Sequence, residues 1–225
     1  HYLTAFLCSK LAEKFVKIIN PTLNYPPGVI GSIPFVFIGN HEERKNIEIN
    51  TKTLINISIA DWESYETTRG FLNNPLLTLG LDPRCRDGHT LEWDGISRPI
   101  EINETIFTKI NSYQNLDLQS VYELWVIVNT KSINEMQRLE ENNNSMLIDA
   151  YGLQRELTPE IPIEQITLTV NPAYRYGIKK SEEERSTRFR EDSMQELISY
   201  SIGCMMGRYS LDEPGLIYAN SGNEG

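Results

Sequence analysis

Cys85 and His89 are four residues apart, and both side chains can ligate zinc. A structural zinc site needs four ligands, and no second pair of cysteines or histidines stands at a suitable spacing. All three histidines fall in terminal or loop-like sequence, so they give no basis for a serine–histidine–aspartate arrangement. We therefore predict no metal site and no hydrolytic centre.

The run Asn171-Pro172-Ala173-Tyr174 is the second candidate for chemistry. It resembles the Asn-Pro-Pro-Tyr motif of adenine-specific DNA methyltransferases, in which the asparagine and a prolyl carbonyl hold the target amino group and the aromatic ring stacks on the flipped base. Here the third position is alanine, and the chain contains no Gly-x-Gly cofactor loop. We interpret the run as a turn, and we predict no catalytic and no cofactor-binding residue in the chain.

Two groups of basic side chains could contact phosphates. The first follows helical spacing within residues 1–19, and the second follows the Asn171 turn. A solvated surface explains such residues equally simply, but a ridge of cations also suits a nucleic-acid backbone. The candidates for DNA contact are Lys10, Lys14, Lys17, Arg175, Lys179 and Lys180.

The distribution of charge limits where nucleic acid could bind. The net charge is −10, which excludes a basic footprint over the whole chain. Residues 1–60 carry six basic and four acidic side chains, whereas residues 117–165 carry three basic and nine acidic ones. Any DNA contact is therefore expected from local patches near the two ends of the chain.

Residues 117–152 form the longest helix-compatible stretch. Apolar residues recur at steps of three and four, no proline interrupts them, and Gly152 stands where a helix would stop. The run Asn142–Ser145 consists of poor helix formers, so a kink or two separate helices are expected there. The fold class predicted is mainly α with a few short strands, in which a long central helix acts as a spacer between N- and C-terminal helical parts.

We divide the chain into three parts. Residues 1–116 would contain a helix (1–19), a Pro/Gly-rich turn, an exposed connection (41–53), a strand (54–59), a short helix started by a Ser58–Asp61 capping box, a loop (70–95) and a helix (100–114). Residues 117–152 would be the spacer helix. Residues 153–225 would contain an extended segment with a strand at 166–170, a mobile charged loop (171–192) and a buried helix (193–208), with Gly203 and Gly207 allowing close approach.

Composition places the protein broadly. No apolar run of about 18 residues occurs, so we predict no membrane association. Three scattered cysteines fit a reducing cytoplasm. The first residues already have helical character and no initiator methionine precedes them, so we expect a piece of a larger protein.

Several stretches together resemble a known family. They are FLCSKLAEKFVKIINPTLNYPPGVIGSIPF, ISIADWESYETTRGFLNNPLL, MLIDAYGLQRELTPEIP and ELISYSIGCMMGRYSLDEPGLIYA, in that order. The resemblance is to the central portion of the large adenine-specific DNA methyltransferases of BREX phage-resistance systems, the PglX family. It implies a parent enzyme that uses S-adenosylmethionine and acts on DNA, with the cofactor loop and the catalytic motif upstream of this segment.

No catalytic residue of that family carries over to this chain. The resemblance implies a non-catalytic spacer beside the DNA-recognition region, with no cofactor of its own and with DNA as the partner of the parent enzyme. The alternative is a scaffold that binds other phage-defence proteins without direct DNA contact. Whether the isolated chain has any activity stays open at this point.

Overall fold

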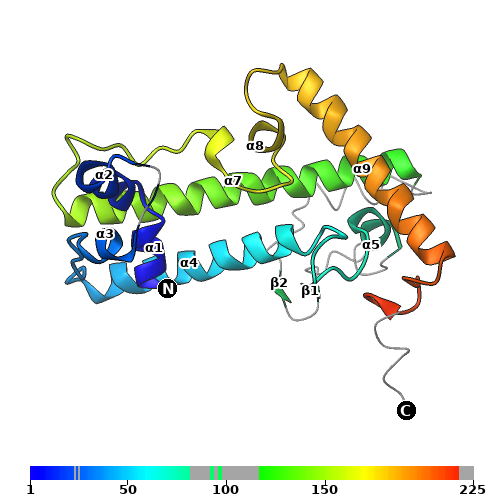
Figure 1. Ribbon diagram of the computed structural model, residues 1–225, viewed down its shortest axis with the longest axis horizontal. Helices are drawn as coiled ribbons and strands as arrows, with labels where there is room; N and C mark the ends of the chain where they lie inside the picture. Colours follow the sequence, from blue (N-terminus) through cyan, green and yellow to red (C-terminus); the bar gives the residue numbers. More distant parts are fainter. Residues whose placement is uncertain (23, 25, 82–91, 94–95, 98–116, 218–225) are drawn as a thin grey trace, which may run out of the picture. The chain divides into compact units, whose positions relative to one another are not determined.

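A computed structural model describes residues 1–22, 24, 26–81, 92–93, 96–97 and 117–217. Figure 1 shows the helices and strands in chain order. The helices are α1 (Tyr2–Leu7), α2 (Lys10–Ile19), α3 (Pro27–Gly31), α4 (His41–Trp62), α5 (Pro75–Leu81), α7 (Leu118–Ala150), a 3-10 helix (Ile163–Gln165), α8 (Pro172–Tyr176) and α9 (Glu182–Met205). The strands β1 (Glu92–Trp93) and β2 (Ile96–Ser97) pair antiparallel, with Glu92 opposite Ser97.

The mainly helical class is confirmed, but both strands predicted from the sequence are wrong. Residues 54–59 are helical within α4, and residues 166–170 form irregular backbone. The predicted helix at 100–114 and the Cys85–His89 pair lie outside the described residues. Part of the loop predicted at 70–95 is helical, because α5 begins there at Pro75.

The chain separates into two compact units, each made of two stretches. Unit 1 contains residues 1–55 and 134–162, and unit 2 contains residues 56–133 and 163–225. This division differs from the three consecutive parts predicted from the sequence. Two helices, α4 and α7, contribute residues to both units, which a division into consecutive parts does not anticipate.

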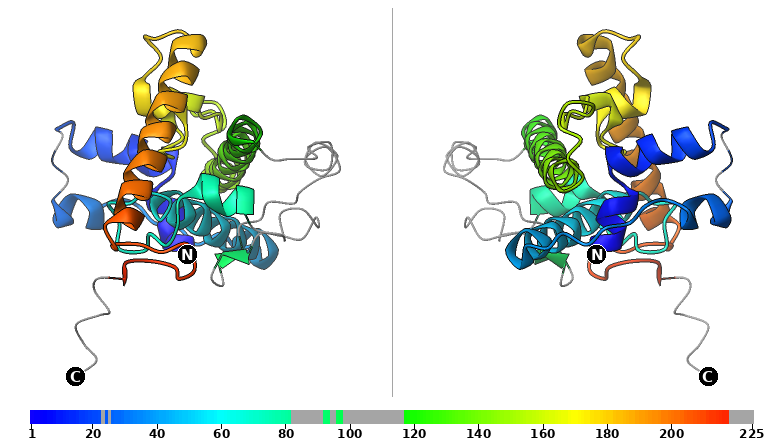
Figure 2. Two further views of the ribbon diagram at one scale, coloured as in Figure 1. Left: turned by 90° about the vertical axis from the view of Figure 1, so that its right-hand side faces the viewer. Right: turned by 90° about the vertical axis from the view of Figure 1, so that its left-hand side faces the viewer.

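The long helix α7 is continuous, so the break expected at Asn142–Ser145 is wrong. Figure 1 shows an unbroken ribbon at this point, and Figure 2 shows the same helix nearly end-on. The asparagines are held by tertiary hydrogen bonds within unit 1. Asn50 Nδ2 donates to Oδ1 of Asn143 at 3.0 Å, and Asn144 Oδ1 accepts the Lys10 backbone N–H at 3.0 Å. These bonds compensate for a low helix propensity.

Residues 1–19 form two helices instead of the single one predicted. The first ends at Leu7 with Cys8 as its C-cap. Ser9 caps the second, because its hydroxyl accepts the backbone N–H of Ala12 at 3.2 Å. Both helices contribute to the hydrophobic core of unit 1, in which Phe6, Leu11 and Leu147 are almost completely buried. The change of direction allows α1 and α2 to present apolar side chains to the same core.

Helix α4 replaces the exposed connection, the strand and the capping box predicted between residues 41 and 61. It runs for 22 residues, and Asn40 Oδ1 accepts the Glu42 backbone N–H at 3.0 Å near its start. Ile47 and Thr51 are buried at helical spacing, so the buried side of this helix is polar as well as apolar. Because polar residues interrupt the apolar positions on the buried side, the sequence does not show the apolar spacing of three and four residues by which a helix is recognised.

The C-terminal region also differs from its prediction. The loop predicted at 171–192 contains α8 and the first half of α9, which begins at Glu182 with a capping box formed by Ser181 and Glu184. The helix predicted as buried exposes apolar side chains, including Ile198 (59% exposed) and Met205 (87%). The close approach predicted at Gly203 is confirmed, since an ideal Cβ there would lie 2.6 Å from Tyr209 Cδ2.

Candidate nucleic-acid interface

Asn171 is a structural residue of unit 2. It is 1% exposed and accepts the Ala173 backbone N–H at 3.1 Å, which caps α8. Its Nδ2 donates to the carbonyls of Ile163 at 2.7 Å and Ile166 at 2.9 Å. Each hydrogen-bonding atom of the side-chain amide is thus occupied within the protein, and the turn predicted at Asn171–Tyr174 is instead the N-cap and the start of helix α8.

Asp61, which the sequence analysis assigned to a capping box, instead organises residues 166–170. Its carboxylate accepts the backbone N–H groups of Thr169 at 2.7 Å and Val170 at 3.0 Å. Asp61 is buried, and charge-assisted hydrogen bonds of this kind hold irregular backbone in place. The alternation of isoleucine, leucine and valine with threonine in this stretch therefore reflects packing of a non-strand segment.

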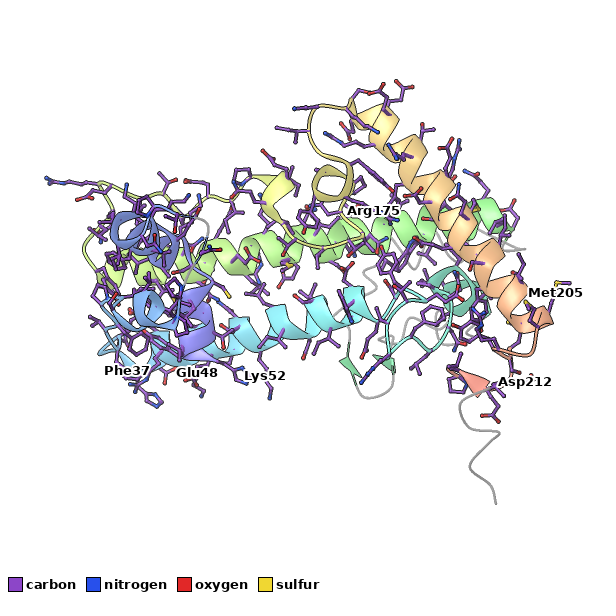
Figure 3. The ribbon with its side chains drawn as sticks, viewed as in Figure 1. Phe37, Glu48, Lys52, Arg175, Met205 and Asp212 are labelled. Atoms are coloured by element: carbon purple, nitrogen blue, oxygen red, sulfur yellow. The ribbon has the colours of Figure 1, made fainter. Side chains whose placement is uncertain are left out.

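Arg175 lies in a cluster of aromatic and acidic side chains within unit 2 (Figure 3). Its guanidinium pairs with Asp192 at 3.1 Å and Glu196 at 3.2 Å. It also lies over the rings of Tyr65 at 5.6 Å and Tyr176 at 5.5 Å. This arrangement links α8 to α9, and it directs the guanidinium toward partners inside the protein.

The surroundings of Arg175 are partly removed from water. Burial raises the pKa of Tyr65 and of Tyr176. Burial also raises the pKa of the Glu196 carboxyl, although Arg175 opposes that change. Tyr176 donates a hydrogen bond to Asp192 at 2.7 Å. We assign Arg175 to the framework of unit 2, and the prediction that it contacts DNA has no support from this geometry.

The three candidate lysines of α2 differ in their exposure and in the partners they contact within the protein. Lys14 is exposed, whereas the Lys10 ammonium donates to the Glu160 carbonyl. Lys17 pairs with Glu13 at 2.5 Å, with both side chains more than half exposed. An exposed pair of this kind contributes little to stability, so Lys17 can exchange Glu13 for a phosphate at small cost. Lys14 and Lys17 are therefore the more accessible of the three.

In unit 2, Lys179 is exposed and Lys180 is half-buried, and both precede the first turn of α9. Three arginines of that helix, Arg185, Arg188 and Arg190, were not among the residues predicted to contact DNA. Arg188 and Arg190 are exposed, and Arg188 lies 5.5 Å from the Tyr176 ring centroid. Recognising the Ser181–Glu184 capping box would have found them, since the box starts the helix eleven residues earlier than predicted.

The six candidate residues fall in different units. Lys10, Lys14 and Lys17 belong to unit 1, whereas Arg175, Lys179 and Lys180 belong to unit 2. Each group thus forms its own local patch. The prediction that these patches contact DNA stays a prediction.

In the described part of the chain, no three His, Cys, Asp or Glu side chains are arranged to hold a metal ion. The same part of the chain has no helix that is both long and apolar enough to cross a membrane.

Comparison with known proteins identifies relatives over nearly the whole chain. An adenine-specific methyltransferase named BrxX, from Escherichia coli O9:H4 (strain HS), is 33% identical over 221 residues, which is 98% of this chain. An adenine-specific methyltransferase named PglX, from Lacticaseibacillus casei (strain Zhang), is 27% identical over 215 residues, or 96% of this chain. The chain corresponds to one segment of the BrxX and PglX methyltransferase family.

The extent of that segment is small in both relatives. The chain spans 15% of the length of BrxX and 14% of the length of PglX. No protein-family model matches the chain. The resemblance stated from the sequence is confirmed at the level of the family, and the chain itself contains no Gly-x-Gly cofactor loop.

Proposed function

We propose that this chain is a non-catalytic helical spacer, associated with DNA recognition, in a site-specific adenine DNA methyltransferase that acts in phage defence. The observation that carries the proposal is the match over nearly the full chain to one segment of two proteins named as adenine-specific methyltransferases. The parent enzyme would use S-adenosylmethionine, and the cofactor would bind outside this segment.

The spacer role is supported by the continuity of α7. This helix has 33 residues, and residues of both units belong to it. At 1.5 Å per residue it is roughly 50 Å long. A non-catalytic role is supported by Asn171, whose amide is fully engaged in capping α8 and in holding two carbonyls.

DNA contact would come from two local patches. In unit 1 it would involve Lys14 and Lys17, and in unit 2 it would involve Lys179 and Lys180 together with the exposed arginines of α9. These cations would contact phosphates and position the segment on the duplex without reading bases. Arg175 has internal partners and is omitted from this set.

The test is the salt dependence of binding to a short DNA duplex. The wild-type chain is predicted to bind weakly, with an association constant that falls as salt concentration rises. The double variant Lys14→Glu/Lys17→Glu should reduce the slope of log affinity against log salt by about 2, since each lost phosphate contact contributes about 0.9. Fluorescence anisotropy with a labelled duplex measures both quantities.

Lys45→Glu/Lys52→Glu is a matched control, because it makes the same change of net charge at two exposed lysines of unit 1 on a different helix. This variant changes the net charge but removes no proposed contact, so its slope should fall by much less. Binding that is absent, or that is insensitive to salt, would contradict the DNA-contact part of the proposal.

A second candidate is a scaffold that binds other phage-defence proteins. It is favoured by the exposed apolar side chains at the C-terminal end of α9, which are Ile198, Ile202, Met205 and the capping residue Met206. Exposed apolar patches often mark interaction surfaces. The variant Ile198→Ser/Ile202→Ser should lose co-purification with other components of the same defence system while retaining salt-dependent DNA binding. Loss of DNA binding alone would favour the first function.

A further inference from the structure

Unit 2 contains a small cavity beside the Arg175 cluster. Its lining comes from the turn after α4, the start of α5, helix α7 and helix α9, and it includes Ser64, Asn74, Trp125 and Ser193. The space open there to a water-sized sphere is about 10 Å³. One water molecule needs roughly 10–15 Å³ measured in this way, so the cavity has room for about one such molecule.

Asn74 brings a hydrogen-bond donor to this cavity. Its Oδ1 accepts the Leu76 backbone N–H at 3.0 Å, directly before α5, and this bond fixes which side of the amide is oxygen and which is nitrogen. Among the described residues, no hydrogen bond uses Nδ2 of Asn74. The residue is only 4% exposed, and a buried amide nitrogen without an acceptor is unfavourable. The cavity is therefore the place where Nδ2 can find a partner.

Two buried serines contribute acceptors. Ser64 donates its hydroxyl hydrogen to the Asp61 carbonyl at 2.6 Å, and Ser193 donates its own to the Phe189 carbonyl at 2.8 Å. Each hydroxyl oxygen keeps two lone pairs, which no hydrogen bond uses within the described ranges. Because both hydrogens are engaged by carbonyls, the serines can offer the cavity only acceptors.

Glu196 and Tyr65 complete the polar part of the lining. The Glu196 carboxylate accepts one hydrogen bond from Arg175 at 3.2 Å and has further lone pairs. The Tyr65 hydroxyl accepts a long hydrogen bond of 3.4 Å from Arg175, and its own hydrogen has no acceptor in the part of the chain that the structure describes. The lining therefore combines donors with acceptors.

An occupant of this cavity must both accept and donate hydrogen bonds. A cation would face the amide hydrogens of Asn74 and the guanidinium of Arg175, whereas an anion would face the Glu196 carboxylate. A water molecule has both functions and fits the volume. We propose that the cavity is a binding site for one internal water molecule, which accepts from Asn74 Nδ2 and donates to the hydroxyl oxygens of Ser64 and Ser193. The site does not depend on DNA binding.

This water would join segments that lie far apart in the sequence. Ser64 follows α4, Asn74 precedes α5 and Ser193 belongs to α9. Within the described ranges, no direct hydrogen bond connects these three side chains to one another. An internal water with about three hydrogen bonds acts as part of the structure and is costly to remove. It would therefore hold α9 to the segment that contains α5.

A high-resolution crystal structure of the chain tests the site directly. We expect electron density for one water molecule at about 2.7–3.2 Å from Asn74 Nδ2 and from at least one of the two serine hydroxyl oxygens. An empty cavity would overturn the proposal. Density for a metal ion or for a larger molecule in the cavity would overturn it as well.

The variant Ser193→Thr tests the site in solution. The added methyl group is close in size to a water molecule, about 30 Å³, and should displace it while the hydroxyl is kept. Ser201→Thr is the matched control, because Ser201 is exposed on the same helix and donates in the same way to the Leu197 carbonyl at 2.8 Å.

Oxygen-17 magnetic relaxation dispersion counts the long-lived internal waters of each protein. The count should fall by one in Ser193→Thr and should stay at the wild-type value in Ser201→Thr. Equal counts in all three proteins would overturn the proposal. If Ser193→Thr does not fold, the crystal structure of the wild-type chain decides between a hydrated and an empty cavity.

Discussion

Glu140 is the residue whose ionisation should affect stability most clearly. It lies half-buried on α7, and burial raises the pKa of its carboxyl from 4.5 to about 7. The folded protein therefore binds a proton more tightly than the unfolded chain does. The contribution of Glu140 to the free energy of unfolding should therefore be largest below pH 5. It should fall by about 1–2 kcal/mol as the pH rises from 5 to 8.

The variant Glu140→Gln tests this prediction. The amide resembles the protonated acid, so it should stabilise the protein at pH 8 and flatten the dependence between pH 5 and 8. Asp149→Asn on the same helix is the control, because Asp149 is exposed. Urea unfolding at several pH values measures the effect, and identical pH profiles of wild type and Glu140→Gln would refute it.

A second prediction at the level of single residues concerns the stability of variants at Asn171. Asn171→Ala removes the cap of α8 and leaves two buried or part-buried carbonyls without a donor, so it should lower the free energy of unfolding by about 2–3 kcal/mol. Asn171→Asp keeps the acceptor for Ala173 but loses both donors, and should be intermediate or equally damaging. Unchanged stability of both variants would indicate that the side chain serves something other than the fold.

Among the elements, α9 depends on a small residue at one position. Tyr209 packs against Gly203 so closely that a methyl group at residue 203 must displace the ring, which also stacks on Tyr200 at 5.1 Å. Gly203→Ala should therefore destabilise the chain by about 1–2 kcal/mol, although alanine is the better helix former. Ser201→Ala, on the exposed side of α9, should be nearly neutral. Thermal unfolding compares the two, and a stabilised Gly203→Ala variant would disprove the packing argument.

Helix α7 shows what could be predicted from the sequence. Its length and ends follow from a regular apolar period and from Gly152, which has a positive φ of 67°. Its continuity at Asn142–Ser145 could not be predicted, because the partners that hold these asparagines lie up to 134 positions away in sequence. The low helix propensity of these residues predicted a break, but hydrogen bonds to residues far away in sequence keep the helix continuous.

The remaining errors have similar causes. Helix α4 was missed because its buried side contains Thr51 among isoleucines, so polarity concealed the helical period. The start of α9 was missed although its capping box is visible in the sequence. The candidate site was partly predictable, since exposure of Lys14 follows from helical spacing. The ion pairs of Arg175 arise from residues 17 and 21 positions further along, which spacing alone does not bring together.

At the scale of the whole molecule, the chain matches one segment of much longer adenine-specific methyltransferases. Nearly all of this chain is matched by the two methyltransferases, but the chain spans only 15% and 14% of their lengths, or about one seventh. Under the proposed function, its charge of −10 would limit DNA contact to local basic patches, and the exposed apolar side chains of α9 would be available to a protein partner. Under the same proposal, methyl transfer would be carried out by parts of the parent enzyme other than this segment.

The proposal that this segment is non-catalytic is tested most directly by isothermal titration calorimetry with S-adenosylmethionine. We expect no saturable heat when the cofactor is titrated into the folded chain, with or without a DNA duplex present. A one-to-one binding isotherm with micromolar or tighter affinity, lost in Asn171→Ala variants that remain folded, would contradict it.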